Sequence, residues 1–250
     1  MTTFLRKKVE KIRAQFSDQF LEFKPYIGNI VMDGHSLRFF YGTPQAVDWY
    51  DPLQRHTRIE FEWMARRLQG TTQKIIDAGA YHGLYTLVLA ASAEPGSEVV
   101  AVDPIRSNCA LIEVNLLLNG LKARIEPCAV SRRKSMVRLS SGSCGHIVNQ
   151  GGIECPALPL TDILPDATVA KVDIEGEEFE IFPEQIDAMS GVHTWNVEIH
   201  PGTGRHPQKI LEAFASRGFQ LLWVNRDSCE VEPYPLAQPW TTRTSIIAIR

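Results

Sequence analysis

The chain has 250 residues, of which 44% are hydrophobic and 22% are charged, as in an ordinary folded protein. Its net charge of −3 gives nucleic acid no general electrostatic attraction, so we expect no nucleic-acid partner. No apolar run approaches the roughly 18 residues that cross a bilayer, and the N-terminus lacks the apolar core of a signal peptide. We therefore expect a cytoplasmic protein without a transmembrane segment.

The cysteines are scattered along the chain and odd in number. They are Cys109, Cys128, Cys144, Cys155 and Cys229, and no two of them form a Cys-x-x-Cys pair. This spacing predicts reduced and mostly buried thiols rather than a disulfide framework or a zinc site.

The first seventy residues predict a small cap made of a helix and a hairpin. Residues 4–16 carry apolar side chains at helical spacing opposite a basic face, and we expect this helix to pack on its own domain rather than lie on a membrane. Asp33-Gly34 joins two apolar runs, at 27–32 and 35–40, which is a strong signature of a two-residue hairpin turn. A further helix is predicted over residues 58–68.

Residues 71–250 alternate strands and helices and predict one α/β domain, on which the first seventy residues form a cap rather than a separate domain. This alternation is typical of an α/β fold with a mainly parallel, seven-stranded sheet and helices on both faces. The predicted strands are 74–77, 98–103, 124–128, 169–173, 194–200, 219–224 and 245–250. The predicted helices are 84–93, 107–118, 180–189 and 207–217.

The stretch from Asp77 to Gly83, which we call the glycine turn, joins the first of these strands to a helix. Gly79 and Gly83 permit a tight turn and a close approach of the backbone to a ligand, and the following helix begins with free N–H groups. The spacing is Asp-x-Gly-x-x-x-Gly, without the middle glycine of the dinucleotide fingerprint. We therefore expect a cofactor site at this turn.

A second acid ends the next strand, at Asp103-Pro104. A carboxylate at this place can accept hydrogen bonds from both hydroxyls of a ribose, and we predict this role for Asp103. The glycine- and serine-rich segment 140–152, which contains His146, is predicted to be a loop or loose hairpin that either faces the substrate or simply connects strands.

A third group of acids follows the strand at 169–173, in the segment Asp173-Ile174-Glu175-Gly176-Glu177-Glu178, which we call the acid loop. Lys171, Asp173 and Glu175 alternate and are expected to share one side of the strand. Glu177 and Glu178 can be explained as acids at the start of a helix, where they favour the helix dipole. Asp173 is explained less well in that way, which indicates a functional site.

Together these stretches resemble the FkbM family of methyltransferases over about residues 70–201. The resemblance is carried by the glycine turn, by Asp103-Pro104, by Lys171-Val172-Asp173-Ile174-Glu175-Gly176-Glu177 and by Glu198-Ile199-His200. Asn108, Asn115 and Asn119-Gly120-Leu121 also match. Tyr81-His82 and Asp103 stand where other residues are commoner in the family, but both changes keep the chemical capacity of the motif.

The resemblance implies a Rossmann-like fold, S-adenosylmethionine as the methyl donor, and methyl transfer to an oxygen of a sugar, polyketide or other secondary metabolite. The cofactor-binding residues it implies are Asp77, Gly79, Tyr81, Gly83, Asp103, Pro104, Asn108 and Asp173. In such a fold the strand that ends at Asp173 lies beside the one that ends at Asp77. Asp173 is then expected near the methyl donor, with Glu198 and His200 near the acceptor.

An alcohol is a weak nucleophile, so a nearby base assists its methylation. The candidates are His200, Asp173, Glu175 and Glu198, and His200 is the first choice because imidazole titrates nearest to neutral pH. Alternatively, this cluster of acids and histidine could hold a magnesium ion. The acceptor and the oligomeric state cannot be read from the sequence.

Two other functions compete with the methyltransferase. One is a nicotinamide-dependent oxidoreductase, against which the missing middle glycine and the Lys-x-Asp-x-Glu-Gly motif argue. The other is a binding module that keeps the fold without turnover, against which the intact acids at three strand ends argue.

Overall fold

The computed structural model describes residues 23–32, 34–140, 142, 145–148, 150–200, 205–236 and 244–250. The helix predicted over residues 4–16 and Cys144 lie outside the described residues. Cys109, Cys128, Cys155 and Cys229 form no disulfide in the described part of the chain. Nor is any helix within those ranges long and apolar enough to cross a bilayer.

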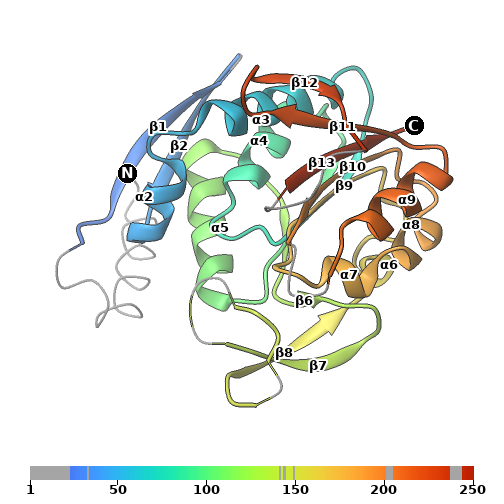
Figure 1. Cartoon of the computed structure of the whole chain (residues 1–250). Helices are drawn as coiled ribbons and strands as arrows, with labels where there is room; N and C mark the ends of the chain where they lie inside the picture. The colour runs from blue at the N-terminus through green and yellow to red at the C-terminus, as the bar shows by residue number, and fades with distance from the viewer. Residues whose placement is uncertain are drawn as a thin grey trace.

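A mixed sheet at the centre of the molecule organises the fold (Figure 1). From edge to edge its described strands are β12 (Glu230–Pro233), β11 (Gln220–Asn225), β13 (Thr244–Ile249), β10 (Thr194–Ile199), β9 (Val169–Val172), β3 (Lys74–Ala78), β4 (Glu98–Val102) and β5 (Arg124–Glu126). The run from β10 to β5 is parallel, whereas β13, β11 and β12 pair antiparallel. All seven predicted strands are present, and β12 adds an eighth that the sequence did not reveal.

Helices cover both faces of the sheet, as predicted (Figure 1). One face carries α2 (Pro44–Tyr50), α3 (Arg55–Arg67), α4 (Leu84–Ser92) and α5 (Arg106–Asn119). The other carries α6 (Leu160–Ile163), α7 (Glu178–Ile181), α8 (Glu184–Ala188) and α9 (Gln208–Ser216). The buried strands therefore read as nearly continuous apolar runs, as in β9, where all four side chains are buried.

The single helix predicted over residues 180–189 is instead two short helices, α7 and α8, that meet at Pro183. Phe182, which precedes the proline, has the extended backbone angles φ −91° and ψ 141°. A residue before proline is sterically pushed out of the helical region, and proline itself has no N–H to donate. The break follows from these two constraints.

The N-terminal hairpin consists of β1 (Tyr26–Met32) and β2 (His35–Tyr41), and the Met32–His35 pairing confirms the predicted turn. Its apolar side chains do not form a core of their own. Phe39 packs into the same buried cluster as Met64 of α3 and Leu84 of α4, so the cap and the sheet layer share one core.

Asn115 of α5 fastens this hairpin to the glycine turn. Its Oδ1 accepts the N–H of Phe40 at 2.7 Å, and its Nδ2 donates to the carbonyl of His82 at 2.8 Å. One turn later, Asn119 makes a comparable pair of bonds to the backbone of Arg38. Asn115 and Asn119 therefore hold the scaffold together, which is a structural reason for their place in the motif.

A small second sheet lies beyond β5 and consists of β6 (Ala129–Val130), β8 (Ile153–Leu158) and β7 (Ser135–Leu139). The predicted loop over residues 140–152 connects β7 to β8. Within its described part, Ile147 forms an isolated bridge with Leu139, and Gly145 and Ile147 line the pocket described below.

Candidate active site

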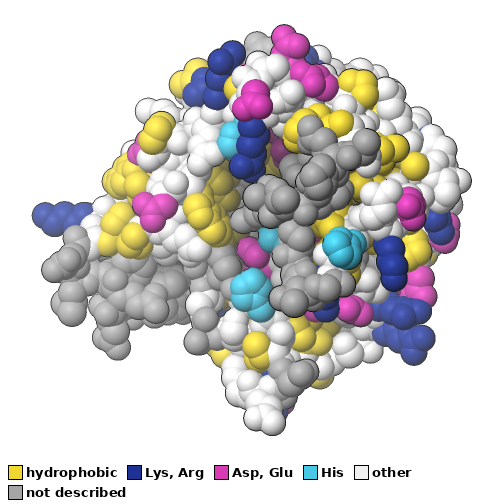
Figure 2. Space-filling view, in the orientation of Figure 1, with side chains coloured by type: hydrophobic (Ala, Val, Ile, Leu, Met, Phe, Trp, Pro, Cys, Tyr) yellow, Lys and Arg dark blue, Asp and Glu magenta, His cyan; other side chains and the backbone are white. Residues whose placement is uncertain are grey.

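A pocket of about 280 Å³ lies at the carboxyl ends of β3, β4, β9 and β10. Its wall includes Gly79, Tyr81, Asp103, Pro104 and Asp173 among the predicted cofactor-binding residues, and Glu175 and Glu198 among the predicted catalytic ones. Trp49, Tyr50, His56 and Glu60 of the cap also line it. Figure 2 shows acidic and histidine side chains gathered in the furrow at the centre of one face.

Gly79 is required at its position by both conformation and space. Its φ of 79° lies in the left-handed region, and a Cβ there would stand 1.6 Å from the carbonyl oxygen of Asp173. The N–H groups of Gly79 and Ala80 donate to the carbonyl of Val102 at 2.9 and 3.0 Å. The glycine turn is thus pressed between the ends of β4 and β9.

Asp103 organises the pocket wall next to the glycine turn. Its Oδ2 accepts the N–H of Tyr81 at 2.9 Å, and its Oδ1 accepts the N–H of Ile105 at 2.8 Å and Nδ2 of Asn108 at 3.1 Å. Burial nevertheless raises the pKa of Asp103 to about 7. Since Oδ1 already accepts two donors, Oδ2 has the greater capacity to accept a ligand hydroxyl.

Asp77, Gly83 and Asn108 stand behind the pocket wall rather than in it. Asp77 is fully buried, and its Oδ2 accepts the hydroxyl of Thr86 at 2.5 Å. Gly83, with a φ of 81°, is the N-cap of α4. These residues hold the glycine turn and Asp103 in place, while the ligand contacts predicted for them stay predictions.

Lys171 of β9 carries a buried positive charge at the centre of the site. Its Nζ donates to the carbonyl of Gly79 at 3.2 Å and to Oδ2 of Asp173 at 3.3 Å, and it lies 3.6 Å from Oδ1 of Asp77. Burial alone would lower the pKa of Lys171, but the surrounding carboxylates raise it above its usual value. The sequence placed Lys171 in the motif without giving it this role.

Glu178 begins the helix α7, as the sequence suggested, but it is not exposed to solvent there. It is fully buried, and its carboxylate accepts the N–H groups of Ile174 and Gly176, each at 2.9 Å. Its Oε1 also lies 3.1 Å from Nδ1 of His200. An ionised carboxylate can only accept, so Nδ1 of His200 is the donor in this bond.

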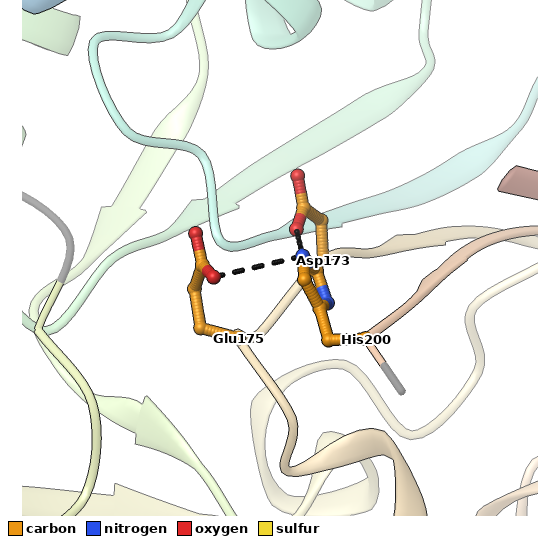
Figure 3. A group of neighbouring side chains, drawn as sticks. All are labelled: Asp173, Glu175 and His200. Carbon is orange, nitrogen blue, oxygen red and sulfur yellow. Dashed lines mark ion pairs between the residues drawn. The ribbon is translucent and has the colours of Figure 1, made fainter. Parts of the chain in front are cut away.

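Nε2 of His200 faces two of the other predicted catalytic residues (Figure 3). It lies 3.6 Å from Oδ1 of Asp173 and 3.6 Å from Oε2 of Glu175. The backbone of Glu175 has a φ of 57°, which is rare outside glycine and is often kept at functional sites. The fold therefore brings Asp173, Glu175 and His200 together, although His200 itself is not among the residues that line the pocket.

A polar network that includes Glu60 of the cap reaches the same pocket, and the sequence did not predict it. Nδ2 of Asn196 donates to Oε1 of Glu60 at 2.9 Å and to the hydroxyl of Tyr85 at 3.0 Å, and Ser245 donates to Oδ1 of Asn196 at 3.3 Å. Burial raises the pKa of Glu60. These four residues come from α3, α4, β10 and β13, and no local motif links them.

The family model described as the methyltransferase FkbM domain matches residues 77–221, more than half of the chain. The chain belongs to the FkbM family of methyltransferases. Methyltransferase activity with S-adenosylmethionine as the donor follows from this membership, and the resemblance drawn from the motifs is confirmed. No curated protein matches the chain significantly in sequence.

Several solved methyltransferases are similar to this FkbM chain at low identity. A SAM-dependent methyltransferase from Agrobacterium tumefaciens shares 12% identity over 92% of this chain and 71% of its own, with a TM-score of 0.49. A SAM-dependent O-methyltransferase from Thermotoga maritima shares 14% over 93% and 80%, also with a TM-score of 0.49. A 16S rRNA methyltransferase from T. thermophilus shares 16% over 92% and 52%, with a TM-score of 0.48.

Replacing Lys171 should destabilise the FkbM chain strongly. Lys171→Met leaves Asp77 and Asp173 without their buried cation, and breaking a buried charge pair in this way costs about 3–5 kcal/mol. The free energy of unfolding from urea denaturation measures this loss.

The matched control is Lys74→Met, because Lys74 also lies in a parallel strand and also pairs with an acid, Asp166, but at the surface. Its free energy of unfolding should change little. Equal losses in the two variants would contradict the structural role of Lys171.

Proposed function

We propose that the chain transfers the methyl group of S-adenosylmethionine to a hydroxyl of a small molecule. The observation that supports this proposal is the pocket, whose wall includes Gly79 and Asp103 as well as Asp173 and Glu175. Nε2 of His200 lies 3.6 Å from the carboxylate oxygens of these last two residues. A methyl donor held by the first group would face an acceptor held by the second. Much of the rate acceleration would come from holding the two in line.

The residues of the donor side suit S-adenosylmethionine. Oδ2 of Asp103 offers a ribose hydroxyl a charged acceptor, and the backbone at Gly79 and Ala80 reaches the pocket wall without a bulky side chain. Lys171 and the acids around it make this part of the pocket strongly polar. We assign the predicted cofactor-binding residues Gly79, Tyr81, Asp103, Pro104 and Asp173 to direct contact, and Asp77, Gly83 and Asn108 to support.

In the reaction, the acceptor oxygen forms a bond to the methyl carbon while the carbon–sulfur bond breaks, and the electron pair of that bond stays on sulfur. The hydroxyl proton must leave the oxygen, and Asp173, Glu175, Glu198 and His200 are the candidates to take it. Glu198 lies in β10 and lines the pocket, whereas His200 directly follows Ile199, the last residue of that strand.

The chemistry of the pocket favours a polyhydroxylated acceptor such as a sugar. Carboxylates at Glu60, Glu175 and Glu198 can accept hydrogen bonds from several hydroxyls, and Trp49 and Tyr50 offer apolar ring faces. The same carboxylates would repel the phosphates of a nucleic acid. These features support a small-molecule acceptor over RNA.

Calorimetric titration should show binding of S-adenosylmethionine and of its demethylated product, S-adenosylhomocysteine, and no binding of NAD. The reason is the Asp-x-Gly-x-x-x-Gly turn with Asp103, which lacks the middle glycine needed for close approach of a pyrophosphate. Binding of NAD with no response to either sulfur nucleoside would overturn the proposal.

The affinity for S-adenosylhomocysteine should rise with pH through about 7 and level off above it. Above its pKa of about 7, Asp103 is ionised and can accept the ribose hydroxyl; below that pH it is protonated and loses a charge-assisted bond. Because such a bond is worth about 1.5–3 kcal/mol, Asp103→Ala should lower the affinity at pH 8 at least about tenfold.

The pH dependence itself should be absent from Asp103→Ala. Asp166→Ala, which removes an exposed acid outside the pocket, should behave like the parent chain. An unchanged affinity in a well-folded Asp103→Ala would remove this residue from the cofactor site.

Loss of His200 should separate turnover from cofactor binding. His200→Ala is expected to lower methyl transfer about 10²–10⁴-fold, because it disrupts the groups that handle the acceptor proton. The affinity for S-adenosylhomocysteine should stay close to that of the parent. The measurement is release of S-adenosylhomocysteine against a panel of sugars, polyols and hydroxylated metabolites, and turnover at the parent rate would disprove the assignment.

A further inference from the structure

The ends of β9 and β10 bring two carboxylates and one imidazole to a single point (Figure 3). One ligand atom from each of Asp173, Glu175 and His200 lies within 4.8 Å of the others. The 3.6 Å separations of Nε2 from the two carboxylate oxygens are too long for direct hydrogen bonds. Metal–oxygen bonds of about 2.0–2.6 Å place neighbouring ligand atoms about 3–3.7 Å apart, which matches the two separations from Nε2.

The hydrogen bond from His200 to Glu178 determines what the other ring nitrogen can do. Because Nδ1 donates to the buried carboxylate, Nε2 of the neutral ring carries a lone pair directed at Asp173 and Glu175. A lone pair that faces two anionic oxygens is repelled by them, and a cation between the three atoms would turn this repulsion into attraction. A histidine whose second nitrogen donates to a carboxylate is also the usual arrangement of a metal ligand.

The acid loop is built to keep Glu175 in this position. Glu178 accepts the N–H groups on either side of Glu175, from Ile174 and Gly176, and thereby supports the left-handed conformation at Glu175. The same buried carboxylate orients His200. One side chain thus positions two of the three converging groups.

The acidic character of the pocket lining also favours a bound cation. Among the described lining residues, the acids are Glu60, Asp103, Asp173, Glu175, Glu177 and Glu198, whereas the permanently cationic side chains are Lys171 and Arg226. S-Adenosylmethionine, with a sulfonium, an ammonium and a carboxylate, supplies one net positive charge. The carboxylates of Asp173, Glu175 and Glu198 would attract a further cation to this part of the pocket.

We propose that Asp173, Glu175 and Nε2 of His200 bind a divalent cation of the Mg²⁺ or Mn²⁺ type. Two carboxylate ligands favour these hard ions, and one imidazole is compatible with Mn²⁺ in particular. Three protein ligands leave positions for the hydroxyl oxygens of the acceptor, so the role of the ion rests on the proposed function. The ion would lower the pKa of the bound hydroxyl.

With His200, Asp173 and Glu175 engaged as ligands, Glu198 is the group left to take the proton. The acceptor hydroxyl gives its proton to the carboxylate of Glu198, and its oxygen bonds to the methyl carbon. The carbon–sulfur bond breaks, and its electron pair remains on the sulfur of S-adenosylhomocysteine.

The test is binding of Mn²⁺ to the full chain after treatment with EDTA and dialysis. Electron paramagnetic resonance reports free Mn²⁺, so a titration in the presence of S-adenosylhomocysteine gives the stoichiometry and affinity without any acceptor. We expect one Mn²⁺ per chain, displaced by excess Mg²⁺. Asp173→Asn and Glu175→Gln should each lower the affinity at least about tenfold, as should Glu178→Gln through the orientation of His200.

Glu184→Gln is the matched control for Glu175→Gln, since it makes the same change at an exposed acid outside the pocket and should leave Mn²⁺ affinity unchanged. Urea denaturation checks that each variant is folded, and His200→Gln replaces any variant that is not. No Mn²⁺ binding by the parent chain, or equal binding by Glu175→Gln and Glu184→Gln, would overturn the inference. Binding of S-adenosylhomocysteine, measured separately, would then still support the proposed function.

Discussion

The ammonium group of Lys171 joins the two halves of the site, and the rest of the pocket depends on it. It contacts the carbonyl of Gly79 in the glycine turn and the carboxylate of Asp173 in the acid loop, and it lies close to Asp77 beneath both. Carboxylates buried this close to one another would repel without a cation between them. One buried charge therefore links the glycine turn to the acid loop.

Close packing strengthens this electrostatic link. Because Gly79 has no Cβ, the carbonyl of Asp173 lies directly against the glycine turn. A movement of β9 relative to β3 would therefore displace this turn. On the other side, Glu178 ties the acid loop to His200 at the end of β10. Lys171 and Glu178 together make a rigid frame across three neighbouring strands, and the reactive groups project from this frame into the pocket.

The sequence predicted those parts of the molecule that depend on local chemistry. Apolar runs that end in an acid located the strands, Asp33-Gly34 located the hairpin, and the spacing of Gly79 and Gly83 located the glycine turn. One local signal was missed. Pro183 breaks the helix predicted over residues 180–189, but the helical spacing of the flanking residues concealed this break.

Other features depend on contacts between segments that are distant in the sequence, and no local sequence pattern predicts them. Glu178 looks like an ordinary acid at the start of a helix, and only the return of the chain at His200 makes it a buried anchor. Glu60 and Asn196 meet across 136 residues of sequence, so no motif could have joined them. The short strand β12 belongs to the sheet because β11 lies beside it rather than because of its own pattern.

The matched family domain supplies only part of the pocket wall. The family model spans residues 77–221 and so includes the glycine turn, Asp103, Lys171 and the acid loop. Trp49, Tyr50 and Glu60 of the cap, together with Arg226, line the same pocket but lie outside that span. In the proposed function, the donor is held by residues within the family domain. The acceptor would be recognised partly by the cap, which packs into the core through Phe39 and is linked by Asn115 to the glycine turn. A change in acceptor could accordingly arise in the cap without disturbing the chemistry of methyl transfer.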